Sequence, residues 1–220
     1  MLILYRLIIN AVCLFAPIIL RIRIYKQKED EDRYKEKLCI IKKKKTQGKL
    51  VWFHAASVGE LLSIVPLLEK LEKIKEIKSI LLTTNTLSSS KVFEKKIKSK
   101  KIIHQFFPFD KDIFAKKFLS HWLPDLVIFV ESEIWPNFIL NIKNKKIPLI
   151  LLNARITTKT YLRWKKIPNF AKSIFNSFDI CLSQNKETEK YLNNFGAKKI
   201  KNLGNLKFSK SNFIGIIIIK

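Results

Sequence analysis

The chain has 220 residues, 47% of them apolar, and its 43 basic and 18 acidic side chains give a formal net charge of +25. This length and apolar content fit one domain or two small ones, and they exclude a mainly disordered chain and a polytopic membrane protein. The charge admits a nucleic acid, a membrane surface or a phosphorylated substrate as partner. Only 6 of the basic residues are arginine, the residue suited to dedicated phosphate or base recognition, so the charge does not choose among these partners.

Residues 1–26 are predicted to form a membrane-anchor helix. Residues 7–20 carry no charge and lie between Arg6 and Arg21. Such a run is short for a bilayer span of about 20 residues unless Arg6 extends to the headgroups, and no small-residue cleavage site follows it. We expect an uncleaved helix embedded in the membrane face, with its basic flank bound to anionic headgroups. An apolar helix packed on the domain is the alternative.

Charged residues dominate the next segment, 27–48, which contains KQKEDEDRYKEK and KKKK. This composition is typical of a solvated linker. From residue 49 the pattern changes to short apolar runs that alternate with helix-like stretches. The runs are continuously apolar, as expected for parallel strands covered on both faces. They span residues 50–54, 79–84, 101–106, 125–130, 148–153, 178–183 and 199–204.

Helices are predicted between these strands, at roughly 60–76, 88–97, 111–120, 134–144, 161–176 and 186–195. The alternation predicts an α/β fold, a doubly wound parallel sheet with right-handed crossovers. Ligands of such sheets bind beyond the carboxyl ends of the strands. The polar segments that follow the strands therefore make up the expected site: AASVGE (55–60), NTLSSS (85–90), ESEIWPN (131–137), ARITT (154–158), QNKE (184–187) and GNLK (204–207).

The segment Ser57-Val-Gly-Glu60 has two interpretations. Gly59 allows a tight strand-to-helix turn, and the start of the helix offers free N–H groups to an anion. Ser-x-x-Glu is equally the pattern of a capping box, which is sufficient on spacing alone. In the functional interpretation Glu60 is a general base, kept ionised at neutral pH by the positive end of the helix dipole.

Other rim residues are candidates of lower specificity. Glu131 and Glu133 follow the most apolar strand, where paired carboxylates can serve acid–base chemistry, although acidic residues are common in the first turn of helices. Arg155 is one of the few arginines and lies on the expected rim. Lys207, after Gly-Asn-Leu, is placed to meet a phosphate, but lysine is abundant throughout this chain.

Several familiar sites are not found in the sequence. GxGxxG, Walker A, GxSxG and HExxH patterns do not occur. Three widely separated cysteines without CxxC spacing predict neither a disulfide framework nor a zinc site. The histidines, His54, His104 and His121, are scattered and are interpreted as packing or surface residues. Neither a metal nor a cofactor is expected.

A set of motifs, in this order, resembles one known family. It comprises HAASVGE (54–60), FFPFD (106–110), PDLVIFVESEIWPNFI (124–139), IPLILLNARIT (147–157), SQNKET (183–188), FGAK (195–198) and GNLKF (204–208). Together they resemble the 3-deoxy-manno-octulosonate (Kdo) transferases of lipopolysaccharide synthesis, which are glycosyltransferases of the GT-B type. Members also carry an N-terminal membrane-associated segment. The resemblance implies a Rossmann-like N-terminal glycosyltransferase domain at 49–208, followed by an unmatched tail at 209–220.

The resemblance implies transfer of Kdo from CMP-Kdo to a lipid A precursor (lipid IVA) at the cytoplasmic face of the inner membrane. Glu60 then corresponds to the general base, and Glu131 and Lys207 to positions that stabilise the transition state. We expect Ser57, Gly59 and Arg155 to lie on the acceptor side of the site. No metal is implied.

The sequence also departs from the family pattern. Members have a second Rossmann-like domain that carries most of the CMP-sugar site, and the tail SNFIGIIIIK does not resemble its start. We therefore expect the acceptor-binding half alone, inactive without its C-terminal donor domain. A non-catalytic, membrane-surface lipid-binding module of the same fold is the alternative. A nucleic-acid binder rests on charge alone, and no nucleic-acid partner is expected.

Overall fold

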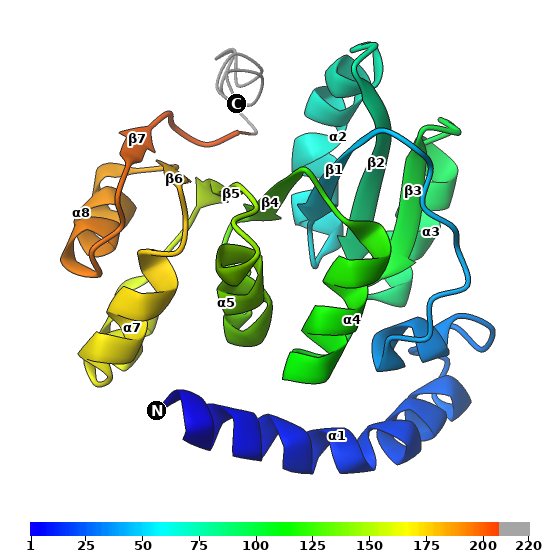
Figure 1. The fold of residues 1–220 in the computed structure, drawn as a ribbon, viewed down its shortest axis with the longest axis horizontal. Helices are drawn as coiled ribbons and strands as arrows, with labels where there is room; N and C mark the ends of the chain where they lie inside the picture. Colours follow the sequence, from blue (N-terminus) through cyan, green and yellow to red (C-terminus); the bar gives the residue numbers. More distant parts are fainter. Residues whose placement is uncertain (207–220) are drawn as a thin grey trace.

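The computed structural model of this chain describes residues 1–206. Its centre is a seven-stranded sheet of parallel strands in the order β3-β2-β1-β4-β5-β6-β7 (Figure 1). The strands are β1 (Lys49–His54), β2 (Ile77–Thr84), β3 (Ile102–Phe106), β4 (Leu126–Val130), β5 (Leu149–Ala154), β6 (Ile180–Ser183) and β7 (Ile200–Asn202). Each coincides with a predicted strand apart from a few residues at the ends. The strand order reverses between β1 and β4, which confirms the doubly wound fold and places a ligand-binding switch point there.

Helices follow the strands as predicted, with one exception. They are α1 (Leu2–Tyr25), α2 (Val58–Glu72), α3 (Leu87–Lys96), α4 (Asp112–Trp122), α5 (Pro136–Asn144), α6 (Thr158–Lys165), α7 (Pro168–Phe175) and α8 (Lys186–Asn194). The single helix predicted at 161–176 is wrong, because α6 ends and α7 begins around Pro168. Proline has no N–H and forces the preceding residue out of the helical region, and Ile167 accordingly has φ −133° and ψ 58°.

The continuous apolar strands are explained by packing on both faces of the sheet. Neighbouring residues of a strand point to opposite faces. In β1, Trp52 belongs to the core cluster that includes residues of α4, α5 and α7, whereas Phe53 belongs to the cluster that includes residues of α2. Trp52 contacts the rings of Phe118, Phe129 and Phe138 at centroid distances of 4.8–5.8 Å. This two-sided core fixes the ends of β1 and β4, on which the rim loops depend.

Helix α1 lies across the lower ends of α4, α5 and α7 (Figure 1). Tyr5 and Arg6 bond to the domain, and Ala16 and Leu20 are its buried apolar residues. Most other apolar side chains of the helix are exposed. By length and composition the helix is long and apolar enough to cross a membrane, and only 6% of its 18-residue apolar stretch is buried in the protein. A long apolar helix is therefore present where the anchor was expected, and it is docked on the domain by a narrow contact; its binding to a membrane stays a prediction.

The segment 27–48 is not the solvated linker expected from its composition. It contains the short 3-10 helix η1 (Tyr34–Leu38), and Glu29 and Lys37 are only 3% and 7% exposed. The Lys37 ammonium donates to Glu29 (2.7 Å) and to the Asn85 carbonyl (2.9 Å). Opposite charges within the segment neutralise one another, so it packs against the domain instead of extending into water.

Candidate functional site

The carboxyl ends of β1 and β4 bring the two sharpest motifs of the sequence to one edge of the sheet. β1 pairs directly with β4, with His54 opposite Phe129. The loop that holds Glu60 therefore lies beside the loop that holds Glu131 and Glu133, as the switch-point rule predicts.

Glu60 and Ser57 form the predicted capping box at the start of α2. Ser57 Oγ accepts from the Glu60 N–H (3.3 Å) and donates to Glu60 Oε1 (2.9 Å). Glu60 Oε2 accepts from the N–H of Ala56 (2.8 Å). Gly59 is the second residue of α2 and is not among the glycines with positive φ. No left-handed backbone conformation therefore requires a glycine at position 59.

The environment of Glu60 makes it a stronger base than the sequence suggested. Burial and, to a smaller extent, the charges of Glu133 and Glu131 together raise the pKa of Glu60 to about 7, against the hydrogen bonds from Ser57 and Ala56, which lower it. The expectation that the helix dipole keeps Glu60 fully ionised at neutral pH is thus corrected. A pKa near neutrality suits a group that takes up a proton at physiological pH.

Glu131 occupies an unusual backbone conformation at the end of β4. Both Glu131 and Asn153, at the end of β5, have positive φ, 58° and 54°. Asn153 Nδ2 donates to Glu131 Oε1 (3.4 Å), and Asn153 Oδ1 accepts from the Leu206 N–H (3.0 Å). Such strain in residues other than glycine concentrates at functional sites. The sequence pattern did not single out Asn153; a polar residue ending an otherwise apolar strand was the available signal.

Glu131 and Arg155 share a cavity of about 190 Å³ between the β4 and β5 loops, α6 and α7. Its walls are mainly apolar, with Ser132 and Thr160 as further polar members; the apolar residues are Ile134, Leu151, Ile156, Trp164 and Phe175. The Arg155 N–H donates to the Glu131 carbonyl (3.4 Å). The structure therefore brings together two residues that the sequence placed on the rim separately.

His54 connects the two loops, a role that the sequence pattern did not reveal. It is fully buried, and its Nε2 lies 3.1 Å from Glu133 Oε2. Trp135 Nε1 donates to the same carboxylate oxygen (2.8 Å), and His54 Nδ1 lies 3.0 Å from Thr83 Oγ1. His54 is thus a packing residue, as interpreted, and also an orienting partner of Glu133. No motif spacing links these residues, since they are about 80 positions apart.

Lys207 is outside the described residues. His104 is buried beside Arg33 and Lys43, and these effects lower its pKa to about 2, so it is a neutral packing residue. Within residues 1–206, no group of three or more His, Cys, Asp or Glu side chains is placed to hold a metal ion.

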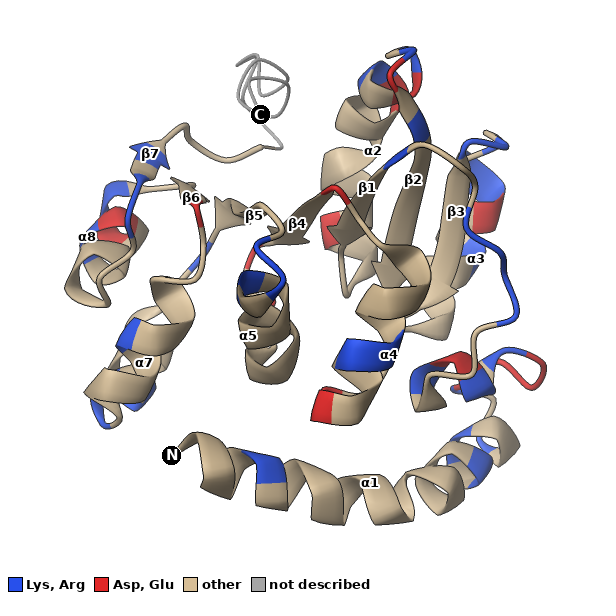
Figure 2. Ribbon diagram, viewed as in Figure 1, with Lys and Arg blue, Asp and Glu red and all other residues tan. Residues whose placement is uncertain are grey.

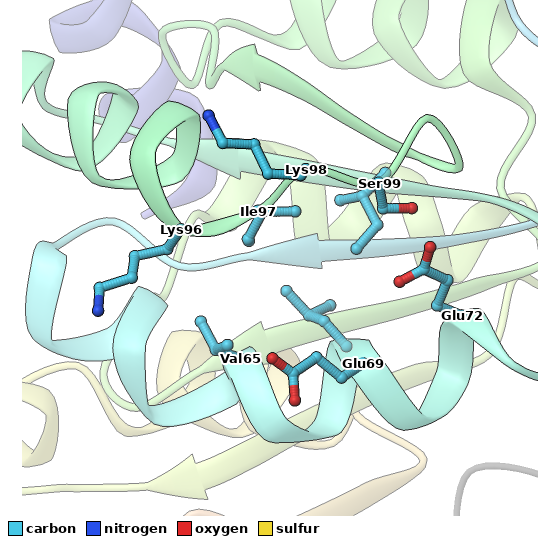
Figure 3. Close-up of a pocket in the computed structure, with 9 residues that line it drawn as sticks. Val65, Glu69, Glu72, Lys96, Ile97, Lys98 and Ser99 are labelled. Atoms are coloured by element: carbon cyan, nitrogen blue, oxygen red, sulfur yellow. The ribbon is translucent and has the colours of Figure 1, made fainter.

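Cavity size does not locate the site. A larger cavity, of about 310 Å³, is lined by residues of α2, of the C-terminal end of α3 and of the segment that follows α3, including Glu69, Glu72, Lys96 and Lys98 (Figure 3). This cavity contains none of the rim residues that the sequence singles out.

The sequence profile of a family described as 3-Deoxy-D-manno-octulosonic-acid transferase (kdotransferase) matches residues 32–210. A 3-deoxy-D-manno-octulosonic acid transferase of Rickettsia bellii is 38% identical over 192 residues, covering 87% of this chain and 46% of that protein. The protein of the same name from Haemophilus influenzae is 28% identical, covering 72% of this chain and 37% of that protein. The chain spans about half the length, or less, of these relatives.

Solved structures support the fold. A UDP-N-acetylglucosamine 2-epimerase aligns with a TM-score of 0.51 at 15% identity, covering 74% of this chain and 47% of that chain. The S. aureus MnaA–UDP structure aligns with a TM-score of 0.51 at 13% identity, covering 76% and 51%. At these identities the likeness is one of fold alone, a Rossmann-like domain of the GT-B type. The fold, the rim loops and the profile match together show that the chain belongs to the 3-deoxy-D-manno-octulosonic-acid (Kdo) transferase family of glycosyltransferases.

Proposed function

We propose that this chain supplies the acceptor side of a Kdo transfer reaction in lipopolysaccharide synthesis, in which Kdo passes from CMP-Kdo to a hydroxyl of a lipid A precursor (lipid IVA). The observation that carries the proposal is the Glu60 carboxylate, held by Ser57 and Ala56 on the switch-point rim with a pKa of about 7. A carboxylate with this pKa takes a proton from an acceptor hydroxyl as the new glycosidic bond forms.

Further roles in the proposed reaction follow from charge. Glu131 and Lys207 stabilise the charge that develops at the anomeric centre and on the departing CMP phosphate. Arg155, exposed at the mouth of the cavity it shares with Glu131, binds an anionic group of the acceptor. Ser57 contributes by holding Glu60, and Gly59 leaves the start of α2 open to the acceptor.

The donor is proposed to bind mainly outside the matched region. The Rickettsia bellii relative is about twice as long as the segment it shares with this chain. We assign recognition of CMP-Kdo chiefly to the remainder of such a protein, so the 220-residue chain by itself is expected to be inactive. No cofactor enters this proposal.

The anionic cytoplasmic face of the inner membrane is the proposed location. Exposed apolar side chains cover most of α1, and basic residues gather near its C-terminal end (Figure 2). The helix crosses the starts of α4, α5 and α7, and helices that follow parallel strands start at the carboxyl-end rim. A bilayer bound to α1 therefore lies near the rim, where a lipid acceptor must arrive.

Complementation in trans tests the proposed reaction. The chain is mixed with the separately expressed C-terminal half of the Rickettsia bellii relative, CMP-Kdo and vesicles containing lipid IVA, and CMP release is measured. We expect turnover that falls by about 100-fold or more in Glu60→Gln, because the amide keeps the capping box but cannot accept a proton. Glu69→Gln, on the exposed side of the same helix, is the matched control. Near-full turnover in Glu60→Gln would reduce Glu60 to a capping residue.

A non-catalytic lipid-binding module is the second candidate. The capping box favours it, because both Glu60 carboxylate oxygens are already hydrogen-bonded. This module would bind vesicles containing lipid IVA but release no CMP in the complemented mixture. The positive control combines the same C-terminal half with the N-terminal half of an active relative, and this mixture should release CMP.

A further inference from the structure

Helix α1 is bound to the domain through a buried carboxylate that has no part in the proposed chemistry. Asp110, in the loop between β3 and α4, is 2% exposed. The hydroxyl of Tyr5 donates to Asp110 Oδ2 over 2.6 Å. The two residues are 105 positions apart, so this contact forms only when α1 docks on the folded domain.

Asp110 also caps the start of α5. Its carboxylate accepts from the N–H groups of Asn137 (3.0 Å) and Phe138 (2.9 Å). Trp135, the N-cap residue of α5, makes no side-chain cap. The free N–H groups in the first turn of α5 are therefore satisfied by a residue from another loop, which fixes where the helix begins.

The segment fixed in this way carries site residues. Residues 131–135 lead directly into α5, and within them Trp135 Nε1 donates to Glu133 Oε2. Glu133 in turn lies beside His54 at the end of β1. An unbroken series of contacts thus runs from Tyr5 through Asp110 and the start of α5 to the acidic loop next to Glu60.

Arg6 adds a second contact of the same kind. Its Nε donates to Asn137 Oδ1 (2.9 Å), and its Nη2 bonds Asp112 Oδ1 (2.7 Å). Arg6 therefore points into the domain and does not extend toward headgroups, the possibility considered from the sequence. The polar groups at the N-terminal end of α1 serve docking, while most of its apolar side chains are exposed.

We propose that Tyr5 and Asp110 are positioning residues, which couple the docking of α1 to the conformation of the acidic loop 131–135. The effect on transfer rests on the proposed function, whereas the coupling itself does not. Loss of the Tyr5 hydroxyl leaves a buried carboxylate with one hydrogen bond fewer, and such a group moves to recover a partner. Movement of Asp110 loosens the start of α5 and the loop before it.

Amide hydrogen exchange in the vesicle-bound chain tests the coupling. Tyr5→Phe is expected to accelerate exchange at the Asn137 and Phe138 amides by about fivefold or more, since local opening becomes easier there. Tyr25→Phe is the matched control, because Tyr25 lies on the same helix and is 89% exposed. Both variants should bind vesicles equally well. Unchanged exchange in Tyr5→Phe would overturn the coupling.

Turnover in the complemented mixture tests its consequence. A positioning role predicts that Tyr5→Phe lowers kcat by about tenfold with little change in KM for the lipid acceptor, because misplacing site groups slows the reaction. A role in anchoring alone would raise KM and spare kcat. Faster amide exchange in Tyr5→Phe with an unchanged kcat would overturn the positioning role. A wild-type mixture without turnover would instead count against the proposed function, and the exchange measurement alone would then decide the coupling.

Discussion

Glu60 has the contacts of a capping residue and also a raised pKa that suits the proposed general base, the two interpretations that the sequence presented as alternatives. The hydrogen bonds from Ser57 and Ala56 complete the capping box, and they also hold the carboxylate in the half-buried position that raises its pKa. The spacing Ser-x-x-Glu predicts the capping box. The raised pKa of Glu60 could not be predicted from the spacing, because it depends on burial and on Glu133, which is 73 positions away along the chain.

Glu60→Gln is expected to change how stability varies with pH. The pKa of Glu60 rises from its ordinary value of 4.5 to about 7 in the folded chain, so the folded state binds the proton more tightly than the unfolded state. The contribution of Glu60 to stability is therefore full below about pH 4.5 and is lost as pH rises through 7. Urea unfolding should show the variant gaining on the wild type between pH 5 and pH 8. Glu69→Gln should follow the wild type, and parallel curves for Glu60→Gln would contradict the shift.

At the scale of single elements, local patterns predicted most of the secondary structure. Continuous apolar runs identified all seven strands, and Asn185 and Ser57 cap α8 and α2 as expected for their residue types. The prediction of one helix at 161–176 was wrong because the pattern of apolar residues continues across Pro168, whereas the helical backbone is interrupted there. The capping of α5 could not be predicted either, since its cap is Asp110 from another loop.

Caps on two helices separate stability from site chemistry. Ser57→Ala and Asn185→Ala each remove a side chain that accepts from a first-turn N–H, which costs about 1 kcal/mol of stability. Only Ser57→Ala removes a hydrogen bond that lowers the pKa of Glu60. Carbon-13 NMR titration should therefore show the pKa of Glu60 rising in Ser57→Ala and unchanged in Asn185→Ala. An equal pKa in both variants would disprove the direct influence of Ser57.

At the scale of the whole molecule, topology was predictable and long-range charge pairing was not. Strand–helix alternation predicted a parallel sheet, and this placed the AASVGE and ESEIWPN loops on one rim. By contrast, the pairing of Arg6 with Asp112, the hydrogen bond from Lys37 to the Asn85 carbonyl and the docking of α1 through Tyr5 join distant segments and leave no local pattern. The sequence therefore identified the residues at the rim better than the contacts that support it.

Membrane binding is expected to depend on the outward face of α1. Leu14 is 73% exposed on this helix, and Leu14→Ser replaces it with a polar side chain. Vesicle affinity should fall by about tenfold, because the variant loses the free energy gained by burying one leucine side chain in lipid. Leu62→Ser, on α2, is the control. Sedimentation with anionic vesicles at several salt concentrations measures both. Equal affinities of the two variants would indicate that binding is carried by charge alone.

The buried pairing of Glu29 with Arg23 and Lys37 has a practical consequence for purification. Arg23 belongs to α1, while Lys37 reaches the Asn85 carbonyl beyond the end of β2. Removal of residues 1–26 would take away Arg23, one of the two cations that pair with the buried Glu29 carboxylate. We expect a chain shortened in this way to be altered near Asn85, so binding and turnover measurements should use chains that retain residues 1–26.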